Sequence, residues 1–317
     1  MTFELGYALS SEEHRPRDLV RYAVASEEAG FSFACISDHF HPWTDSQGQS
    51  PFVWSVLGGV AQSTNHLRLG TGVTCPIMRT HPAVIAQAAA TTAAMMPGRF
   101  FLGVGTGENL NEHITGERWP SVRERQEMLE EAVEIIRLLW LGGNHSHRGR
   151  YFTVVNARIY TLPEEPPPII VAATGPESTD LAARIGDGLW TTAPKPELID
   201  TFVAAGGTGP RYGKVTVCWA ATEEEAKHTA HHWWPNIGIP GELELELPLP
   251  RHFEQAARLV GPDRLGEQMA LGPDPERHLD AIRSYSDAGF DHVYVHQVGP
   301  DQEGFFRFYE REVLPKL

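Results

Sequence analysis

The chain has 317 residues, of which 41% are hydrophobic and 21% charged, and its formal net charge is −15 at pH 7. A surface this negative repels nucleic acid and anionic membranes, so we expect neither as a partner. No apolar run approaches the length that crosses a bilayer, and the first residues, MTFELGYALS, lack the basic start and apolar stretch of a secretory signal. The sequence therefore predicts a globular protein of the cytoplasm.

The three cysteines, Cys35, Cys75 and Cys218, lie on apolar segments, and their spacing is unlike that of metal ligands. An odd number of cysteines in such segments is typical of reduced thiols in a protein core. We expect neither a disulfide nor a bound metal such as zinc.

Apolar runs of strand length alternate with segments of helical period along most of the chain. The expected order is strand 3–9, helix 16–30, strand 32–36, helix 51–63, strand 67–75, helix 82–96, strand 100–107, helix 122–140, a hairpin within 149–160, strand 168–175, helix 178–185, strand 188–193, helix 195–205, strand 214–222, helix 276–288, strand 292–299 and helix 303–314. Between about 223 and 272 the alternation gives way to a helix-rich, acidic region.

Eight strands, each followed by a helix or a helical excursion, predict one (β/α)8 barrel, the TIM-barrel architecture, over residues 1–317. No linker rich in proline, glycine and serine is long enough to separate domains. The region 223–272 is then a late insertion. A doubly wound open sheet has the same alternation and is the second possibility.

The first candidate site is a strand that ends in polar residues. In the segment SFACISDHFHPW, from Ser32 to Trp43, an apolar run stops at Asp38 and His39, and Trp43 is near enough in sequence to line the same cleft. In barrels and open sheets alike, catalytic groups gather at the carboxyl ends of strands. An isolated Asp-His pair is more often a simple turn, so the interpretation depends on other strands that end in the same way.

The strand at 100–107 also ends in this way. It runs into GVGTGE (103–108), which lacks the GxGxxG spacing of a dinucleotide-binding turn, and Glu108 follows the strand end as His39 does. A carboxylic acid and an imidazole in one cleft act as general acid and base when burial raises the carboxyl pKa. A cap on the next turn or helix explains Glu108 equally well.

Two further strand ends are candidate ligand sites. The segment GTGV (70–73), just before Cys75, is either a bulge or a distorted backbone on which a flat ring can lie. The segment ATGP (173–176) precedes a helix, whose first backbone amides can hold an anionic group. A plain strand-to-helix turn explains the same four residues.

Together these segments resemble the luciferase-like barrel superfamily, and within it the oxidoreductases that use the 8-hydroxy-5-deazaflavin coenzyme F-420, particularly the glucose-6-phosphate dehydrogenase branch. The matching segments are LGYALSSEE, ISDHFHPW, LRLGTGVTCP, HPAVIAQAAAT, RFFLGVGTGENLNE, LPEEPPPIIVAATGP and IGDGLWTT. The resemblance implies a (β/α)8 barrel, a homodimer, and a deazaflavin ring at the barrel mouth.

The resemblance also implies four catalytic residues. His39 takes the proton of a substrate hydroxyl, Glu108 protonates the reduced ring, Trp43 lines the site, and Glu12 is an active-site carboxylate of the first loop. The implied coenzyme-binding residues are Asp38, His39, Gly72, Val73, Cys75, Thr106, Gly107, Glu108, Asn111, Ala173, Thr174, Gly175 and Pro176. A cis peptide bond is implied between Gly72 and Val73, and Cys75 stands where the family commonly has a hydroxyl residue.

The substrate positions depart from those of the sugar-phosphate enzymes, in which a threonine and three basic residues hold the phosphate. Thr192 and Lys195 match two of these positions, whereas Glu244 and Gln268 stand where a lysine and an arginine are expected. A carboxylate repels a phosphate dianion. We therefore expect hydride transfer between the coenzyme and the carbon of a non-phosphorylated alcohol, ketone or sugar.

Three alternatives stay open. The first is a sugar-phosphate substrate such as glucose 6-phosphate. The second is an FMN-dependent luciferase-like monooxygenase, which uses the same barrel to activate oxygen. The third is a non-catalytic barrel that binds a flavin-like ligand. The pairing of His39 with Glu108 favours proton and hydride transfer.

Overall fold

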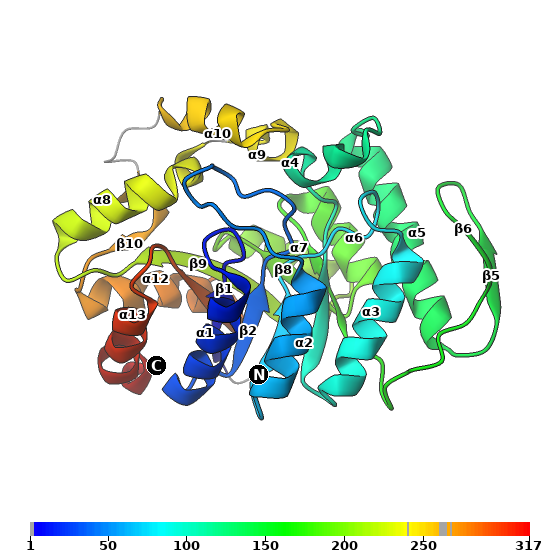
Figure 1. The fold of residues 1–317 in the computed structure, drawn as a ribbon, viewed down its shortest axis with the longest axis horizontal. Helices are drawn as coiled ribbons and strands as arrows, with labels where there is room; N and C mark the ends of the chain where they lie inside the picture. The colour runs from blue at the N-terminus through cyan, green and yellow to red at the C-terminus, as the bar shows by residue number, and fades with distance from the viewer. Residues whose placement is uncertain (1–2, 240, 260–264, 267) are drawn as a thin grey trace.

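The computed structural model describes residues 3–239, 241–259, 265–266 and 268–317. At its centre are eight parallel strands: β1 (Glu4–Leu9), β2 (Phe33–Ile36), β3 (Arg68–Thr71), β4 (Phe100–Val104), β7 (Ile169–Ala172), β8 (Gly188–Thr191), β9 (Arg211–Cys218) and β11 (His292–Gln297). Each pairs with the next in chain order, and β11 pairs with β1, so the sheet closes on itself (Figure 1). The predicted (β/α)8 barrel is confirmed, and the open-sheet alternative was wrong.

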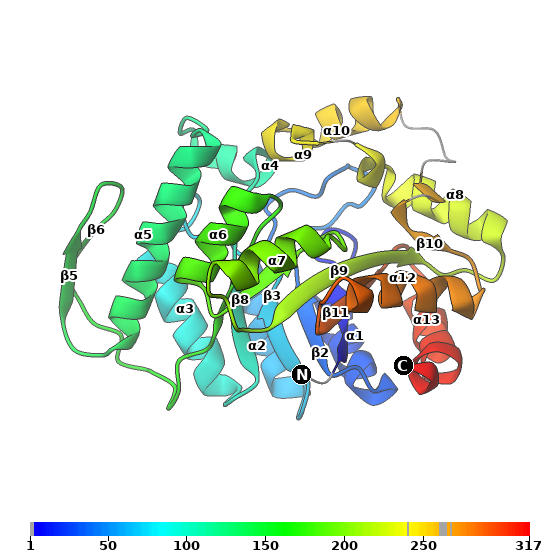
Figure 2. The same cartoon turned by 180° about the vertical axis from the view of Figure 1, so that it is seen from behind.

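Helices cover the outside of the barrel (Figures 1 and 2). They are α1 (Pro16–Ala29), α2 (Val53–Ser63), α3 (Pro82–Met95), α5 (Val122–Trp140), α6 (Pro176–Ile185), α7 (Pro196–Ala204), α12 (Pro275–Asp287) and α13 (Gln302–Phe308). The buried face of α3 is mostly alanine, with Ala86, Ala89, Ala90 and Ala93 in the core. These small side chains let the helix approach its neighbours closely.

Side chains on the barrel strands alternate between two environments. In β1, Leu5, Tyr7 and Leu9 face the helices and belong to the main hydrophobic core. The inward side chains form a second, largely aromatic core: Phe33, Phe101, Trp190, Tyr212 and Tyr294. Since these rings fill the barrel interior, a ligand site has room only nearer the strand ends.

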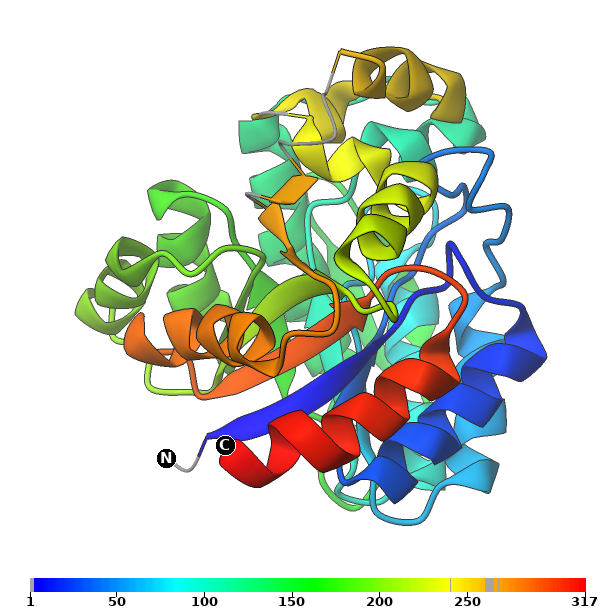
Figure 3. The same cartoon turned by 90° about the vertical axis from the view of Figure 1, so that its left-hand side faces the viewer.

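The chain between β9 and β11 forms most of a cover over one end of the barrel. It contains α8 (Glu223–Trp233), a 3-10 turn (Pro235–Gly238), α9 (Leu243–Glu246), α10 (Pro250–Ala257) and the short strand β10 (Ala270–Leu271), which pairs with β9. Figure 3 shows this helical group at one end of the molecule and the C-terminus at the other. The described residues of the range 223–272 therefore lie above the carboxyl ends of the strands, and the interpretation of this range as an insertion stays a prediction.

Three smaller features complete the fold. A short helix, α4 (Asn109–Glu112), and a 3-10 turn (His113–Thr115) follow β4, and a hairpin of β5 (His145–Arg148) and β6 (Thr153–Ala157) follows α5. After α13 the chain ends in a π turn (Tyr309–Val313) and a 3-10 turn (Leu314–Lys316). Among the described residues, none of the helices combines the length and apolar character that a membrane span requires.

Candidate active site

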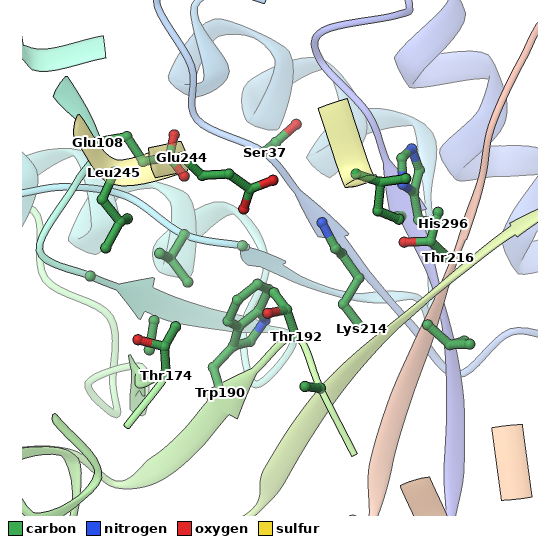
Figure 4. Close-up of a pocket in the computed structure, with 18 of the residues that line it drawn as sticks. Ser37, Glu108, Thr174, Trp190, Thr192, Lys214, Thr216, Glu244, Leu245 and His296 are labelled. Carbon is green, nitrogen blue, oxygen red and sulfur yellow. The ribbon is translucent and has the colours of Figure 1, made fainter. Parts of the chain in front are cut away.

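The carboxyl ends of the strands open into a cavity of about 1500 Å³ (Figure 4). This exceeds the volume of an ordinary small-molecule pocket, so the cavity has room for a large cofactor and a substrate together. Among its lining residues are most of those expected at a site: Glu12, Asp38, His39, Trp43, Gly72, Val73, Cys75, Thr106, Gly107, Glu108, Asn111, Ala173, Thr174, Gly175, Pro176, Thr192, Glu244 and Gln268.

Lys195 is the exception. It is exposed and precedes the first residue of α7, Pro196, and it is not part of the cavity wall. The wall ends at Pro194, because the chain then turns outward into the helix. Contact of Lys195 with a substrate stays a prediction.

His39 lies between two carboxyl groups. Its Nε2 is 3.4 Å from Oε1 of Glu12 and 3.5 Å from Oε2 of Glu108. The ring of Trp43 packs against the imidazole, with 5.1 Å between the ring centroids. Glu12, His39 and Glu108 follow β1, β2 and β4, so three strand ends bring together residues that are far apart in sequence.

Asn111 fixes the geometry of this group. Its Oδ1 accepts hydrogen bonds from the backbone amides of Phe40 and His41, and its Nδ2 donates to Oε2 of Glu108 at 3.0 Å. The same Nδ2 lies 3.2 Å from Nδ1 of His39. The loop after β2 and the acid after β4 are thus tied together by one buried amide.

The two carboxyl groups beside His39 hold a proton with different strength. Burial raises the pKa of Glu108, an effect that His39 reduces and the charge of Glu12 reinforces. Burial acts on Glu12 as well, but His39 and a 2.6 Å hydrogen bond from the Ser37 hydroxyl outweigh it, so the pKa of Glu12 is lowered. Glu12 is therefore the stable carboxylate and Glu108 the better proton donor.

Asp38 is already engaged by protein groups. Its carboxylate accepts a hydrogen bond from the Thr74 hydroxyl at 2.8 Å and pairs with Arg79 at 2.9 Å. Glu112 accepts from the backbone amide of Arg79 at 2.8 Å, and burial raises its pKa to about 7. This cluster holds the loop after β3 in place, and contact of Asp38 with a coenzyme stays a prediction.

The floor of the cavity is backbone with few side chains. The peptide bond between Gly72 and Val73 is cis, as the resemblance implied. A Cβ on Gly105 would lie 2.8 Å from a methyl of Val73, and a Cβ on Gly107 would meet the sulfur of Cys75 at 2.5 Å. A side chain at Gly105 or Gly107 would displace Val73 or Cys75, so glycine lets this backbone pack closely beneath the cavity, and the resulting floor fits one face of a flat tricyclic ring.

Beyond the floor, α6 begins at the cavity edge. Gly175 is its N-cap and Pro176 its first residue, and the Ser178 hydroxyl accepts from the backbone amides of Thr174 and Gly175 at 3.2 Å each. A helix N-terminus at a cavity wall favours an anionic group, such as the phosphate of a cofactor. Binding of such a group here stays a prediction.

Sequence reasoning missed two polar residues that line the cavity, Lys214 and His296. Lys214 was expected to open its strand, but β9 begins at Arg211 and the alternation of Tyr212, Lys214 and Thr216 turns the lysine inward. His296 lies at a matching inward position of β11, with Nε2 3.0 Å from Oε2 of Glu13. A period-two reading of HVYVHQ in β11 could have found His296.

The two residues that replace expected basic groups, Glu244 and Gln268, line the cavity, and their contact with a substrate stays a prediction. Glu244 extends from α9 into the cavity (Figure 4). Burial raises its pKa to about 7, which Glu108 reinforces and Lys214 reduces. Gln268 is exposed and lines the cavity edge.

A closed (β/α)8 barrel with an imidazole and two carboxyl groups at its mouth defines the class of protein. Residues 1–292 match the family model described as luciferase-like monooxygenase, and the chain belongs to this luciferase-like family.

Within the family, the chain is similar to proteins whose names specify coenzyme F-420. It is 37% identical to an F-420-dependent glucose-6-phosphate dehydrogenase of Microbacterium testaceum over 98% of this chain and 96% of the relative. It is also 37% identical to the enzyme of that name from Kribbella flavida, over 100% of this chain and 99% of the relative. Among solved structures, an F-420-dependent secondary alcohol dehydrogenase in complex with an F-420-acetone adduct has a TM-score of 0.92 at 30% identity, with 99% of each chain covered.

Proposed function

We propose that this protein is a coenzyme F-420-dependent oxidoreductase that exchanges a hydride between the deazaflavin ring and an alcohol or carbonyl carbon. The observation that carries the proposal is the placement of His39 Nε2 within 3.5 Å of the carboxyl groups of both Glu12 and Glu108, beside a glycine-lined floor. The F-420-dependent relatives, which match nearly the whole chain, support the same coenzyme.

The residues that would hold the coenzyme fall into three groups. Gly72, Val73 and Gly107 would lie under the ring, where the floor has few side chains. Asn111 and Glu108 would border the ring, and the residues at 173–176 would take an anionic group at the start of α6. When bound, the deazaflavin supplies a ring carbon that accepts or gives a hydride.

The proton is handled by the protein. In alcohol oxidation, His39 accepts the hydroxyl proton on Nε2, and the adjacent Glu12 carboxylate stabilises the imidazolium that forms. Glu108 keeps a proton at higher pH than an ordinary glutamate, because burial raises its pKa, and it donates that proton on the coenzyme side. Trp43, which is 8% exposed, excludes water from the imidazole.

Two substrate classes are candidates. The names of the curated relatives favour a sugar phosphate, glucose 6-phosphate, and support it at least as well as the non-phosphorylated substrate expected from the sequence. Glucose 6-phosphate is therefore the first compound to test. The position of Glu244 inside the cavity and of Lys195 outside it favours a non-phosphorylated alcohol or sugar, because a carboxylate repels a phosphate.

The test begins with the coenzyme. The protein is titrated with oxidised F-420 and, separately, with FMN, and the F-420-loaded protein is then mixed with sugars, sugar phosphates and secondary alcohols. We expect F-420 to bind and its oxidised absorbance to fall with at least one alcohol. Binding of FMN alone, with oxygen uptake, would instead support a monooxygenase, and F-420 binding without turnover of any compound would support a binding protein.

A further inference from the structure

Lys214 and Glu244 bring an ammonium and a carboxyl group to the same part of the cavity. Lys214 comes from the middle of β9 and Glu244 from α9, and Figure 4 shows both side chains extending into the space between the barrel and its cover. Among the described residues, neither the Lys214 ammonium nor the Glu244 carboxyl group has a hydrogen bond or an ion pair within 4.0 Å.

The two groups are nevertheless close enough to affect one another. Burial raises the pKa of Glu244, and the charge of Lys214 counteracts that rise. Lys214 acts in the same direction on Glu108, so the ammonium also lies near the catalytic group. Both residues are only partly buried, so water or a group of a bound ligand completes their hydrogen bonds in the cavity.

A hydroxyl group is the simplest group that satisfies both. Its oxygen accepts a hydrogen bond from the Lys214 Nζ, and its hydrogen is donated to a Glu244 oxygen. A phosphate satisfies only the lysine when Glu244 is ionised, since the Glu244 carboxylate would repel its charge. Thr192 adds a neutral hydroxyl to this wall, because the register of Thr191 with Gly213 places Thr192 beside Lys214.

We propose that Lys214 and Glu244 bind a second hydroxyl group of the substrate, on a carbon other than the one whose hydroxyl meets His39. The proposal rests on the oxidoreductase function above and deepens it. It assigns the substrate to the polyhydroxylated class, a sugar or polyol with no phosphate on the hydroxyl held by this pair. Lys214 and Glu244 are then specificity-determining residues.

The experiment uses the F-420-loaded protein and three probes: glucose, glucose 6-phosphate and propan-2-ol. Glucose binding is measured by calorimetry, and turnover of all three is followed by the loss of oxidised deazaflavin absorbance. The variants are Lys214→Met, Glu244→Gln and the double variant. Lys316→Met, at an exposed ion pair near the C-terminus, is the matched control. The Kd for F-420 shows whether each variant is folded.

We expect Lys214→Met and Glu244→Gln each to weaken glucose binding and raise its KM by roughly tenfold or more, with a much smaller change in kcat. The KM for propan-2-ol, which has a single oxygen, should not change. The double variant should lose less than the product of the two single losses, because both side chains hold the same hydroxyl. Lys316→Met should match the unmodified protein.

Several results would overturn the proposal: no glucose binding by the unmodified protein, glucose binding that neither variant weakens, or an equal loss for propan-2-ol. Turnover of glucose 6-phosphate that depends on Lys195 and not on Lys214 would overturn it as well. Glucose binding that both variants weaken, without turnover of any probe, would uphold the recognition pair and count against the oxidoreductase function. The two failures are thus distinguishable.

Discussion

At the level of single residues, the site contains one residue type in two chemical states. Glu12 and Glu108 both lie within 3.5 Å of His39 Nε2, yet the pKa of Glu12 is lowered and that of Glu108 is raised. The difference arises because Ser37 donates a 2.6 Å hydrogen bond to Glu12, whereas burial dominates at Glu108. Two carboxyl groups whose environments separate their pKa values are suited to different roles, here charge stabilisation and proton donation.

The first prediction concerns pH. Because the raised pKa keeps Glu108 protonated above the usual range of a glutamate, kcat in the direction that uses its proton should fall as the pH rises through that pKa. This fall of kcat at higher pH is the alkaline limb of the pH profile. In Glu108→Gln the alkaline limb should be absent, and kcat should be lower by about 100-fold or more. Glu12→Gln should keep the limb but move it to lower pH, since the charge of Glu12 contributes to the raised pKa. A limb that is unchanged in Glu108→Gln would assign the proton to another group.

The rule that catalytic residues follow strand ends was enough to single out His39 and Glu108 from the sequence, and the resemblance added Glu12. Lys214 was missed for a physical reason. A lysine within an apolar run suggests the end of a strand, because a charge in a filled barrel is costly. Its position in the middle of β9 is tolerated because the side chain reaches the cavity beyond the aromatic core, and a cavity is not visible in the sequence.

At the level of elements, the loops after β3 and β4 form the floor on which a coenzyme ring would lie. Gly105→Ala places a methyl group 2.8 Å from a methyl of Val73, which must shift, so we expect the Kd for F-420 to rise by about tenfold and the protein to lose about 1–3 kcal/mol of stability. The control is Gly58→Ala in α2, where nothing lies within 4 Å of the new methyl. That change should leave F-420 binding alone and stabilise the protein by about 0.5–1 kcal/mol. Equal F-420 affinity in both variants would mean that the ring lies elsewhere.

The strand boundaries were predicted less well than the strands themselves. The third strand was expected to run to Cys75, but its ladder ends at Thr71, and only an isolated bridge from Thr74 to Val104 follows. The seventh barrel strand, β9, begins three residues earlier than expected, at Arg211, and ends at Cys218. The pattern of apolar residues indicates which residues are buried, not which residues pair in the sheet. Buried residues such as Cys75 continue past the last hydrogen bond of the third strand, so this strand was predicted too long.

A cluster of ionisable residues lies at the amino ends of the barrel strands and leads to a prediction about stability. Asp291 accepts bonds from the backbone amide and the guanidinium of Arg211 at 2.7–3.0 Å, and from His292 Nδ1 at 2.6 Å. Burial opposes the charge of Asp291, but His292 and Arg211 outweigh it and lower its pKa below the usual 3.8. This stabilisation is complete above the unfolded-state pKa and is lost as the pH falls through the lower folded-state value.

Asp291→Asn should therefore lower the free energy of unfolding by roughly 2–4 kcal/mol at neutral pH, measured by urea denaturation. The difference from the unmodified protein should shrink in strong acid. Asp180→Asn, which breaks an exposed pair with Arg184, should have little effect. Equal effects of the two substitutions would show that the cluster contributes no more than a surface ion pair.

At the level of the whole molecule, the closure of the sheet into a barrel distinguishes this fold from the doubly wound open sheet that the sequence also allowed. The alternation of strands and helices predicted eight strands and their order, but alternation is the same in a barrel and in an open sheet. The distinction lies in the pairing of β1 with β11 across the whole length of the chain, and of β8 with β9 within it. Such pairings depend on strand tilt and register, which no local pattern encodes.

The resemblance implies a homodimer, and this stays a prediction. Light scattering at micromolar concentration should give twice the chain mass of 35.1 kDa. The mass should not depend on salt between low and physiological ionic strength if apolar contacts dominate the interface, despite the net charge of −15. A mass of one chain at all concentrations would contradict it.

The central claim is that His39 moves the substrate proton beside a bound deazaflavin, and a single variant tests it most directly. For His39→Asn, both kcat and the Kd for F-420 are measured, with His228→Asn on the exposed face of α8 as the control. We predict a kcat lowered by about 100-fold or more, F-420 affinity within a factor of about three, and a control that matches the unmodified protein. An unchanged kcat in His39→Asn, with F-420 still bound, would contradict the claim.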